Sequence, residues 1–402
     1  MEKQILHVDV NNAYLSWTAL DMLKHGSKLD IREIPAIIGG DESKRSGIVL
    51  AKSMKAKECG VKTAETIYQA KQKCPNLQVF SPRFDVYKEN SNKLYHLLLE
   101  YTDKIERFSI DECFMDMTNY LMNDSLLNKG KEINRRIKEE LGFTVNVGVA
   151  HNKLLAKMAS DFQKPDRVHT LWEKEIPTKM WPLPVSELFM LGKKTVPKLY
   201  NMQIKTIGQL AKSDKNILQK KFGKHGILMW EYANGIDNSE VKYLPERPKC
   251  ISNSVTLPVN ISNLSRLEEI VTVISDQVAY RLRKEGLLAN TVNVQLRTKD
   301  FEDSSHQSKL PQATDVTKEI SEKAKELLKQ MYKKGMQIRL VGVKVDNFIE
   351  KEQQQLSLFS NSNKKQKNLD KVMDNLKEKY GYNIIKRAGK MDLDGFVKLK
   401  DV

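Results

Sequence analysis

The apolar pattern in the first part of the chain predicts a sheet flanked by helices. Residues 4–10 form a short apolar run, which is typical of a strand buried on both faces. Asp9 interrupts this run near its end, and a helical stretch begins at Ala13. The elements expected after it are a helix near 94–101, paired strands within 105–117, a helix over 133–141, a strand at 144–149 and a helix over 153–162. This order predicts an α+β fold built on a split βαβ sheet with its helices on one face.

The second half of the chain has a pattern of the same kind. Its predicted elements are a strand at 252–257, a helix at 264–284, strands at 291–297 and near 307, a helix at 316–332 and a strand at 337–345. The order βαββαβ predicts an independent domain. Between the two patterns we expect short helices with glycine-containing joints after Pro165, and an extended, basic linker at residues 236–249.

The chain becomes polar from Asn347 onward, which is typical of a tail outside the folded domains. Leu356, Leu358 and Phe359 form an isolated apolar cluster there, the pattern of a short motif that docks into a pocket of another protein. Further on, apolar residues at helical spacing predict a short amphipathic helix. These residues are Leu369, Val372, Met373 and Leu376.

The charge of the chain narrows the candidate partners. Its 402 residues include 67 Lys and Arg against 51 Asp and Glu, which gives a net charge of +16 and a pI near 9.4. Nucleic acid is therefore the first candidate partner. An anionic membrane surface is the alternative, but no 18-residue apolar run offers a span, and we predict no membrane association.

The cysteines indicate neither a zinc site nor a disulfide framework. Cys59, Cys74, Cys113 and Cys250 lie far apart without CxxC spacing. The start of the chain passes straight into the first predicted strand and has no signal-peptide pattern. We therefore expect reduced thiols and a cytoplasmic protein.

Three carboxylates are the candidate metal-binding and catalytic residues. Asp9 lies in an apolar strand, and Asp111 and Glu112 fall at the predicted turn of the paired strands. A carboxylate in a central strand must be paired or metal-bound to offset its desolvation. Two Mg²⁺ ions held by these oxygens could activate a 3′-hydroxyl and stabilise a leaving pyrophosphate. A structural role stays open at this point, since isolated strand aspartates are more often helix caps or ion-pair partners.

Four segments resemble motifs of one enzyme family, the damage-tolerant Y-family DNA polymerases. The two catalytic motifs are matched by H-V-D-V-N-N-A-Y at 7–14 and F-S-I-D-E-C-F at 108–114. The fingers motif is matched by residues 56–62, and the palm motif by residues 152–165. The chain thus resembles a Y-family polymerase, DinB-like or UmuC-like and of the bacterial DNA polymerase IV type, over nearly its whole length.

The resemblance implies a right-hand polymerase with a ferredoxin-like split βαβ palm, small fingers, a helical thumb and a βαββαβ little finger. The implied boundaries are 1–27 and 76–165 for the palm, 28–75 for the fingers, 166–235 for the thumb, 236–249 for the linker, 250–348 for the little finger and 349–402 for the tail. The implied activity is low-fidelity, template-directed translesion synthesis. We expect no proofreading, because no second acidic cluster in the sequence suggests an exonuclease.

The resemblance also assigns roles to residues. Asp9, Asp111 and Glu112 would be the catalytic metal ligands, and the carbonyl of Val10 would complete the coordination shell of one metal ion. Glu112 could also assist deprotonation of the primer hydroxyl. Tyr14 would be the steric gate that excludes ribonucleotides, although its helical position alone favours a core tyrosine. The implied triphosphate-binding residues are Asn12, Ala13 and Tyr14 through their backbone, and Lys57 and Lys164 through their charge.

The resemblance further implies cofactors and partners. Two Mg²⁺ ions would bind in each active site, with Mn²⁺ as a substitute, and the partners would be primer–template DNA and dNTPs. The expected DNA-binding residues are Arg247, Lys249, Arg297 and Lys299. The tail segment Gln355-Leu356-Ser357-Leu358-Phe359 is similar to the bacterial sliding-clamp-binding pentapeptide. Apart from the clamp, we expect a monomer.

Two positions depart from the family pattern. Met54 stands where family members usually carry a tyrosine, so a hydrogen bond to the triphosphate is in doubt. Met190 stands where the thumb's helix-hairpin-helix turn usually has its first glycine. Two other functions remain as alternatives: a catalytically inactive polymerase-like protein that binds DNA and the clamp, and a nucleotide cyclase on a similar palm. The lesions bypassed and the need for accessory subunits stay open.

Overall fold

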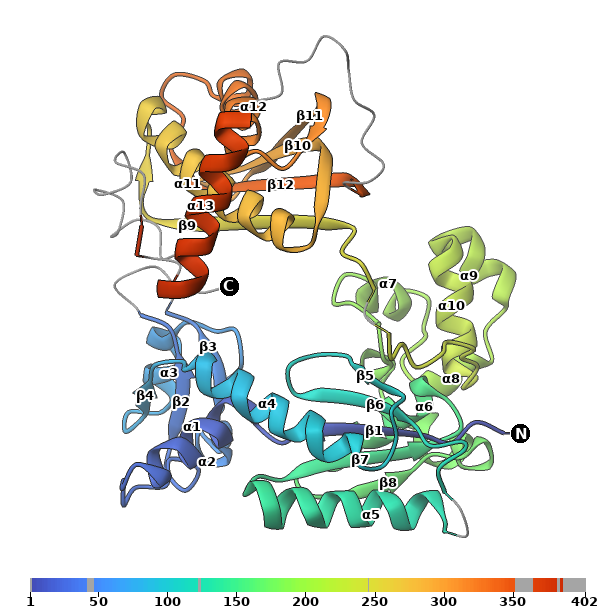
Figure 1. Cartoon of the computed structure of the whole chain (residues 1–402). Coiled ribbons are helices and arrows are strands. Elements are labelled where there is room, and N and C mark those ends of the chain that lie inside the picture. Colours follow the sequence, from blue (N-terminus) through green and yellow to red (C-terminus); the bar gives the residue numbers. More distant parts are fainter. Residues whose placement is uncertain are drawn as a thin grey trace. The chain divides into compact units, whose positions relative to one another are not determined.

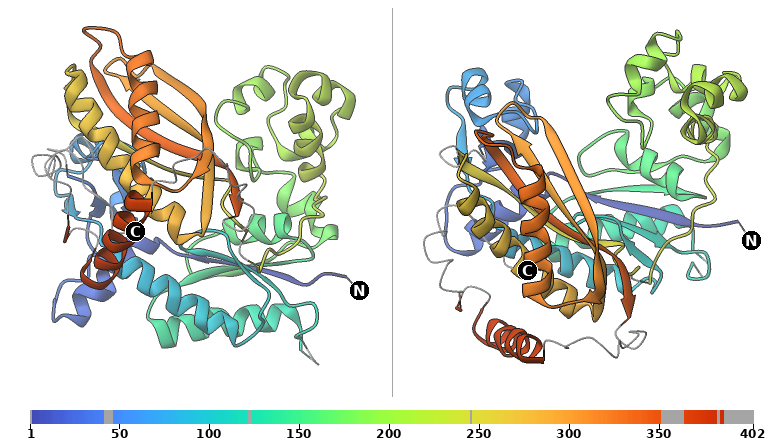
Figure 2. Two further views of the ribbon diagram at one scale, coloured as in Figure 1. Left: turned by 45° about the horizontal axis from the view of Figure 1, so that its top comes forward. Right: turned by 90° about the horizontal axis from the view of Figure 1, so that it is seen from above.

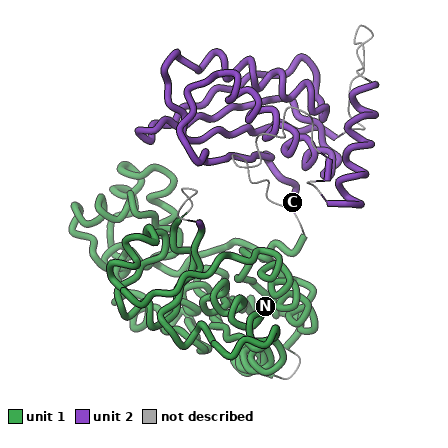
Figure 3. Tube along the Cα trace, turned by 90° about the vertical axis from the view of Figure 1, so that its left-hand side faces the viewer, with its two compact units in different colours: residues 1–40, 47–245 green, residues 41–46, 246–402 purple. Residues whose placement is uncertain are grey.

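The computed structural model describes residues 2–41, 47–121, 124–244, 246–350, 364–381 and 384–385. Figures 1 and 2 show the elements from three sides. The chain forms two compact units, residues 1–40 with 47–245 and residues 41–46 with 246–402, which Figure 3 colours separately. None of the helices in these described ranges has the length and apolar character that a bilayer span requires.

A five-stranded sheet in the first unit carries the candidate carboxylates. Its order is β5-β6-β1-β7-β8. The strands are β1 (Ile5–Val10), β5 (Ile105–Arg107), β6 (Glu112–Asp116), β7 (Val145–Ala150) and β8 (Val168–Thr170). β1 pairs antiparallel with β6 and β7, while β8 runs parallel to β7. The predicted strands are confirmed, but β8 has no sequence signal because three residues are too few to show a period.

Helices cover both faces of this sheet, so the prediction of helices on one face is wrong. α4 (Phe84–Leu99) and α5 (Leu126–Arg136) share a core with Leu6, Val8 and Val10, and α6 (Lys153–Asp161) shares the opposite core with Ile5. The reason is the strand period, since successive side chains of β1 point to opposite faces and all six residues are buried. α6 therefore lies over the face to which Asp9 points.

The insertion after α1 (Ala13–Lys24) forms a second, three-stranded sheet in the order β3-β2-β4. Its elements are β2 (Ala36–Gly39), β3 (Val49–Lys52), α2 (Met54–Glu58), α3 (Ile67–Lys73) and β4 (Gln78–Phe80). Side-chain caps start both helices: Ser53 Oγ accepts a hydrogen bond from Ala56 N–H, and Thr66 forms a capping box with Gln69. The Ser53 cap sets where β3 ends and α2 begins, and the Thr66 cap sets where α3 begins.

Short helices follow Pro165, as predicted. They are α7 (Val196–Tyr200), α8 (Ile207–Ala211), α9 (Lys215–Phe222) and α10 (Lys224–Ala233), and their apolar residues continue the core under α6. Met190, which precedes α7, has a φ of 67° and is 62% exposed. A methionine thus adopts the left-handed conformation at the position where the family pattern has glycine.

The second unit contains a four-stranded sheet in the order β11-β10-β12-β9. Its elements are β9 (Cys250–Ile261), α11 (Leu264–Lys284), β10 (Leu287–Thr298), β11 (Asp303–Thr314), α12 (Thr317–Met331) and β12 (Ile338–Glu350). The predicted βαββαβ order is confirmed. Val292, Val294 and Leu296 face the helices, so Asn293 and Gln295, which alternate with them, point to the other face.

The structure has a helix, α13 (Lys364–Tyr380), where the apolar spacing in the tail predicts one. Of the four apolar residues with this spacing, Leu369 and Val372 are 45% and 55% exposed, and Met373 and Leu376 are half-buried. Asp370 and Lys377 are almost fully buried. The clamp-motif prediction at residues 355–359 lies outside the described residues.

Ion pairs attach α13 to α11. Arg283 contacts Asp370 Oδ2 at 3.4 Å and Asp374 Oδ2 at 2.5 Å, and Lys377 Nζ contacts Asp276 Oδ2 at 2.8 Å. Charged side chains thus make the contacts between α13 and α11, and the apolar spacing in the sequence does not indicate them.

Candidate active site

Strand geometry brings Asp9 and Glu112 side by side. They are direct partners in the antiparallel β1–β6 pair, so both side chains point to the face covered by α6. Asp111 precedes β6 in the hairpin loop, and its carbonyl accepts a hydrogen bond from Val10 N–H at 3.0 Å. The predicted turn is confirmed, and it gathers the three carboxylates at one end of β1.

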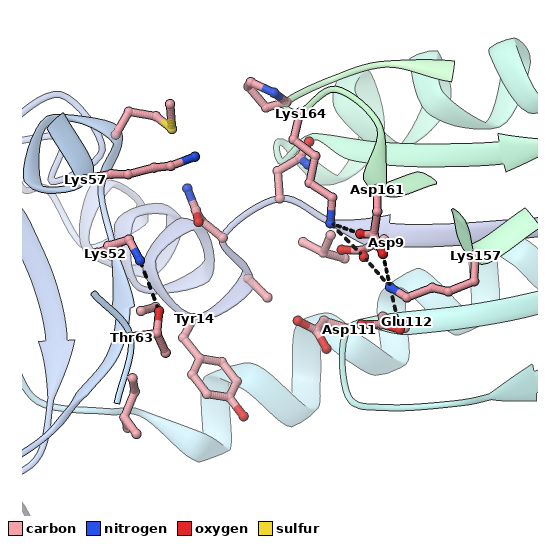
Figure 4. A pocket seen from close by; sticks show the side chains of 18 residues that line it. Asp9, Tyr14, Lys52, Lys57, Thr63, Asp111, Glu112, Lys157, Asp161 and Lys164 are labelled. Atoms are coloured by element: carbon pink, nitrogen blue, oxygen red, sulfur yellow. Dashed lines mark hydrogen bonds and ion pairs between the residues drawn. The ribbon is translucent and has the colours of Figure 1, made fainter. Parts of the chain in front are cut away.

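Two lysines contact Asp9, and one of them also contacts Glu112, as Figure 4 shows. Lys157 Nζ lies 3.1 Å from Asp9 Oδ2, 3.1 Å from Glu112 Oε2 and 3.4 Å from Asp161 Oδ2. Lys164 Nζ lies 2.9 Å from Asp9 Oδ2 and 2.9 Å from Asp161 Oδ1. These ion pairs offset the desolvation of Asp9, which is only 6% exposed. One alternative left open by the sequence, an ion-paired strand aspartate, is thus observed.

The same carboxylates fit a divalent cation chemically. Within the described ranges, no three His, Cys, Asp or Glu side chains are grouped to hold a metal ion. Lys157 bridges Asp9 and Glu112, and Asp111 Oδ1 accepts a hydrogen bond from Ser109 Oγ at 2.7 Å. Glu112 Oε2, however, is buried without a hydrogen bond, although Lys157 lies within ion-pair distance. Carboxylate oxygens are the ligands that a hard cation such as Mg²⁺ prefers, so the three side chains suit such an ion.

Neighbouring charges hold Glu112 ionised. Burial alone would raise its pKa, but His7 and Lys157 together lower the pKa to about 2. His7 Nε2 lies 3.3 Å from Glu112 Oε2, and burial lowers the pKa of His7. The pKa of Asp111 is raised, mainly by burial and also by the charges of Asp9 and Glu112. A carboxylate with a pKa near 2 is a weak base, so Glu112 suits cation binding better than proton abstraction.

Amide side chains fix the segment that carries Lys164. Asn11 Nδ2 donates to Asn146 Oδ1 at 3.1 Å, and Asn11 Oδ1 accepts from Asp166 N–H at 2.9 Å. Asn146 Nδ2 donates to the carbonyls of Ser160 at 2.9 Å and Gln163 at 2.8 Å. These buried bonds join β1, β7 and residues 160–166, so the backbone beneath Lys164 has a defined place beside Asp9.

A pocket of about 470 Å³ lies between the carboxylates and residues of the segment 50–63. Tyr14, in the first turn of α1, lines it, and its ring stacks on Tyr87 with a centroid separation of 4.5 Å and meets Phe84 edge-on at 5.9 Å. Asn12, just before α1, has a φ of 48° and makes no side-chain cap. The first backbone N–H groups of α1 therefore remain available to an anion.

The structure brings the predicted catalytic and nucleotide-binding residues together. Those that line the one pocket are Asp9, Val10, Asn12, Ala13, Tyr14, Lys57, Asp111, Glu112 and Lys164. Met54, the departure from the family pattern, lines it as well. Sequence reasoning missed Lys157, Asp161, Lys52 and Thr63, which also line it. A signal existed for Lys157 and Asp161, since both lie in the motif at 152–165. The contact of Lys157 with Asp9, and that of Asp161 with Lys157, depend on the fold.

The predicted DNA-binding residues belong to the second unit. Arg297 pairs with Asp303 through two contacts of 2.8 Å, and Arg247 pairs with Glu350. Both pairs are exposed enough to solvent for a phosphate to compete with them.

A carboxylate-bearing sheet, a fingers sheet across a pocket and a separate βαββαβ unit define the right-hand architecture of Y-family DNA polymerases. A solved Y-family DNA polymerase chimera has this fold with a TM-score of 0.74, at 23% identity over 86% of this chain and 99% of that chain. The chain belongs to the impB/mucB/samB family, whose model matches residues 8–161 and whose C-terminal domain model matches residues 248–358.

Curated relatives match along nearly the whole chain. A protein of Clostridium acetobutylicum named DNA polymerase IV is 46% identical over 96% of this chain and 98% of its own length. A protein of the same name from Acetivibrio thermocellus is 37% identical over 96% of this chain and 97% of its own. DNA polymerase IV 1 of Bacillus subtilis is 35% identical over 96% of this chain and 92% of its own length.

Proposed function

We propose that the chain is a low-fidelity, template-directed DNA polymerase for translesion synthesis, which transfers a nucleotide from a dNTP to a primer 3′-hydroxyl. The relatives named DNA polymerase IV and the Y-family fold support this activity, and the chain is accordingly a DNA-directed DNA polymerase. The observation that carries the proposal is the pocket, in which Asp9 and Glu112 lie opposite Lys57 and beside Tyr14. It suits a nucleoside triphosphate, which is anionic at one end and carries a sugar and a base at the other.

Asp9, Asp111 and Glu112, with the carbonyl of Val10, would hold two Mg²⁺ ions, or Mn²⁺ in their place. When bound, the two ions activate the 3′-hydroxyl and stabilise the departing pyrophosphate. Asp9 must then exchange its contacts with Lys157 and Lys164 for contacts with a cation. Asp161 already contacts both ammonium groups, at 3.4 Å and 2.9 Å, so each lysine keeps a carboxylate partner during this exchange.

The incoming nucleotide would be held at both ends. Lys57, Lys164 and the uncapped N–H groups from Asn12 to Tyr14 supply positive charge to its triphosphate. The ring of Tyr14 stacks on Tyr87 and would lie beneath the sugar. A 2′-hydroxyl would meet this ring, so Tyr14 acts as the steric gate.

Primer–template DNA would contact the second unit through the polar face of its sheet. Arg297 follows the polar residues Asn293 and Gln295 along β10, and Lys299 comes directly after the strand. Arg247 and Lys249 precede β9. Their charges suit phosphate contacts, which position a duplex without reading its sequence. In the exposed pair with Asp303, Arg297 would exchange a carboxylate for a phosphate at little cost.

Residues 355–359 would attach the enzyme to a sliding clamp, and apart from the clamp the enzyme would work as a cytoplasmic monomer. This part of the proposal rests on the Q-L-S-L-F sequence. Replacing Leu358 and Phe359 with alanine should abolish stimulation by the clamp and leave clamp-independent extension unchanged. Equal stimulation of both proteins would contradict clamp binding at this motif.

Primer extension tests the function itself. The wild-type chain should extend a primer on undamaged and lesion-bearing templates only when Mg²⁺ is present, and should not excise a mismatched primer end. The variant with Asp111→Ala and Glu112→Ala should bind DNA but not extend it. Glu89→Gln, an exposed change on α4, serves as the control. DNA binding without extension by the wild type would support the inactive accessory protein instead.

A further inference from the structure

The fingers wall of the pocket carries a second ammonium group to which the mechanism above gives no role. Lys52 is the last residue of β3 and lines the pocket together with Lys57 and Thr63. Its Nζ donates a hydrogen bond to Thr63 Oγ1 at 3.2 Å. Figure 4 shows this pair on the wall away from the carboxylates, between Lys57 and Tyr14.

The local structure defines the position of Lys52. Its backbone pairs with Ile37 of β2, and the next residue, Ser53, is only 1% exposed. Ser53 Oγ donates to the carbonyl of Ile34 at 2.7 Å and accepts from the N–H groups of Ala36 and Ala56 at 3.1 Å each. Because this hydroxyl fixes the turn from β3 into α2, Lys52 leaves the backbone in a set direction.

The charge of Lys52 is poorly compensated. Partial burial and the nearby charge of Lys57 lower its pKa, against a smaller opposing effect of Glu65, which is itself paired with Lys73. In the described residues, Lys52 has no carboxylate within 4.0 Å, whereas Lys157 and Lys164 across the pocket each contact at least two. Two like charges on one wall of the pocket, of which that of Lys52 is partly buried, favour an anionic ligand.

We propose that Lys52, steadied by Thr63, binds the terminal phosphate of the incoming nucleotide. This inference deepens the polymerase function proposed above and rests on it. The alternative ligand, a base edge, is neutral, and it would lie against the apolar wall of Leu50 and Ala51. The side chain of Met54 has no hydrogen-bond donor, so Lys52 and Thr63 supply the polar contacts on this wall of the pocket. The fingers thus hold the triphosphate with two cations, and the contact of Lys52 is lost with a diphosphate.

Equilibrium binding tests this proposal apart from catalysis. The full chain is bound to a primer–template whose primer lacks a 3′-hydroxyl, and dATP or dADP is titrated in Mg²⁺. Lys52→Met should weaken dATP binding about tenfold, which equals about 1.4 kcal/mol, and dADP binding by less than about threefold. Lys52→Arg should restore most of the affinity. Lys55→Met, an exposed change on α2 outside the pocket, should have no effect.

Several results would overturn the role of Lys52. Unchanged dATP affinity refutes the contact, and equal weakening of dATP and dADP indicates a structural role. Weakening that differs among the four dNTPs indicates a base contact. Thr63→Val, which removes only the hydroxyl that holds Nζ, should weaken dATP about threefold if Lys52→Met fails to fold. A wild type that binds dATP but cannot extend a normal primer refutes the polymerase function instead.

Discussion

Replacing Lys157 with methionine should destabilise the first unit in metal-free buffer and much less in Mg²⁺. Lys157 is 8% exposed, and its Nζ contacts Asp9 and Glu112 at 3.1 Å each. Removing one partner of a buried ion pair typically costs about 3 to 5 kcal/mol because a charge is left uncompensated. Lys164 keeps its contact with Asp9 at 2.9 Å, which reduces the cost. We therefore expect a loss of about 2 to 3 kcal/mol.

The melting temperature converts this loss into a measurable shift. In a unit of this size, a loss of 1 kcal/mol lowers Tm by about 2 to 4 °C, so the drop in EDTA should be about 4 to 12 °C. Magnesium at a hundred times its Kd stabilises the protein that binds it by about 2.7 kcal/mol. The carboxylates released from Lys157 bind the cation without competition, so the gap to the wild type should narrow to about 3 °C or less.

Thermal unfolding of both proteins in EDTA and in MgCl₂ measures the two shifts. Lys93→Met is the matched control, since Lys93 makes an exposed pair with Glu89 on α4 and its loss should move Tm by less than about 2 °C. If Lys157→Met lowers Tm equally in both buffers, or does not lower it in EDTA, Lys157 is not a counter-ion for the metal ligands.

Three further predictions concern single residues. Tyr14→Ala should raise the incorporation of ATP relative to dATP at least about tenfold in single-nucleotide insertion, since the gate is removed, and unchanged discrimination would remove this assignment. In metal-free buffer, wild-type stability should exceed that of Glu112→Gln at pH 5, and the two should converge in urea titrations as the pH falls from 4.5 toward 2. The pKa of Glu112 is about 2 in the folded protein and 4.5 in the unfolded chain, so ionised Glu112 stabilises the fold fully above pH 4.5. This contribution is lost as the pH falls through the folded pKa. A difference in stability between the two proteins that stays constant with pH would contradict this. Met190→Gly should raise the free energy of unfolding by about 1 kcal/mol, because a φ of 67° strains methionine; a lower urea midpoint counts against such strain.

Strand period and turn position make much of the carboxylate-bearing sheet predictable. The apolar run at 4–10 predicts a central strand, and β1 is buried along its whole length. The turn predicted near Asp111 exists, and since a turn sets the register of its hairpin, Glu112 begins β6. The roles assigned to the residues of the pocket rest on the family resemblance and remain to be tested.

Contacts between distant segments could not be predicted. The burial of β1 on both faces requires two layers, yet the order of elements does not say that α6 supplies the second. The contact of Lys157 with Asp9 joins residues 148 positions apart. The ion pairs of α13 join it to Arg283 and Asp276 of α11, which lie about a hundred residues earlier in the chain, so the sequence of α13 alone could not predict them.

Single-turnover nucleotide incorporation as a function of Mg²⁺ concentration tests the central claim most directly. With a primer–template and the correct dNTP, the wild-type rate should rise with Mg²⁺ to a plateau. Asp9→Asn removes the charge of the most buried carboxylate of the three and should lower the rate at saturating Mg²⁺ by at least about a thousandfold. A wild type without Mg²⁺-dependent incorporation, or an Asp9→Asn variant that keeps the wild-type rate, would contradict the account.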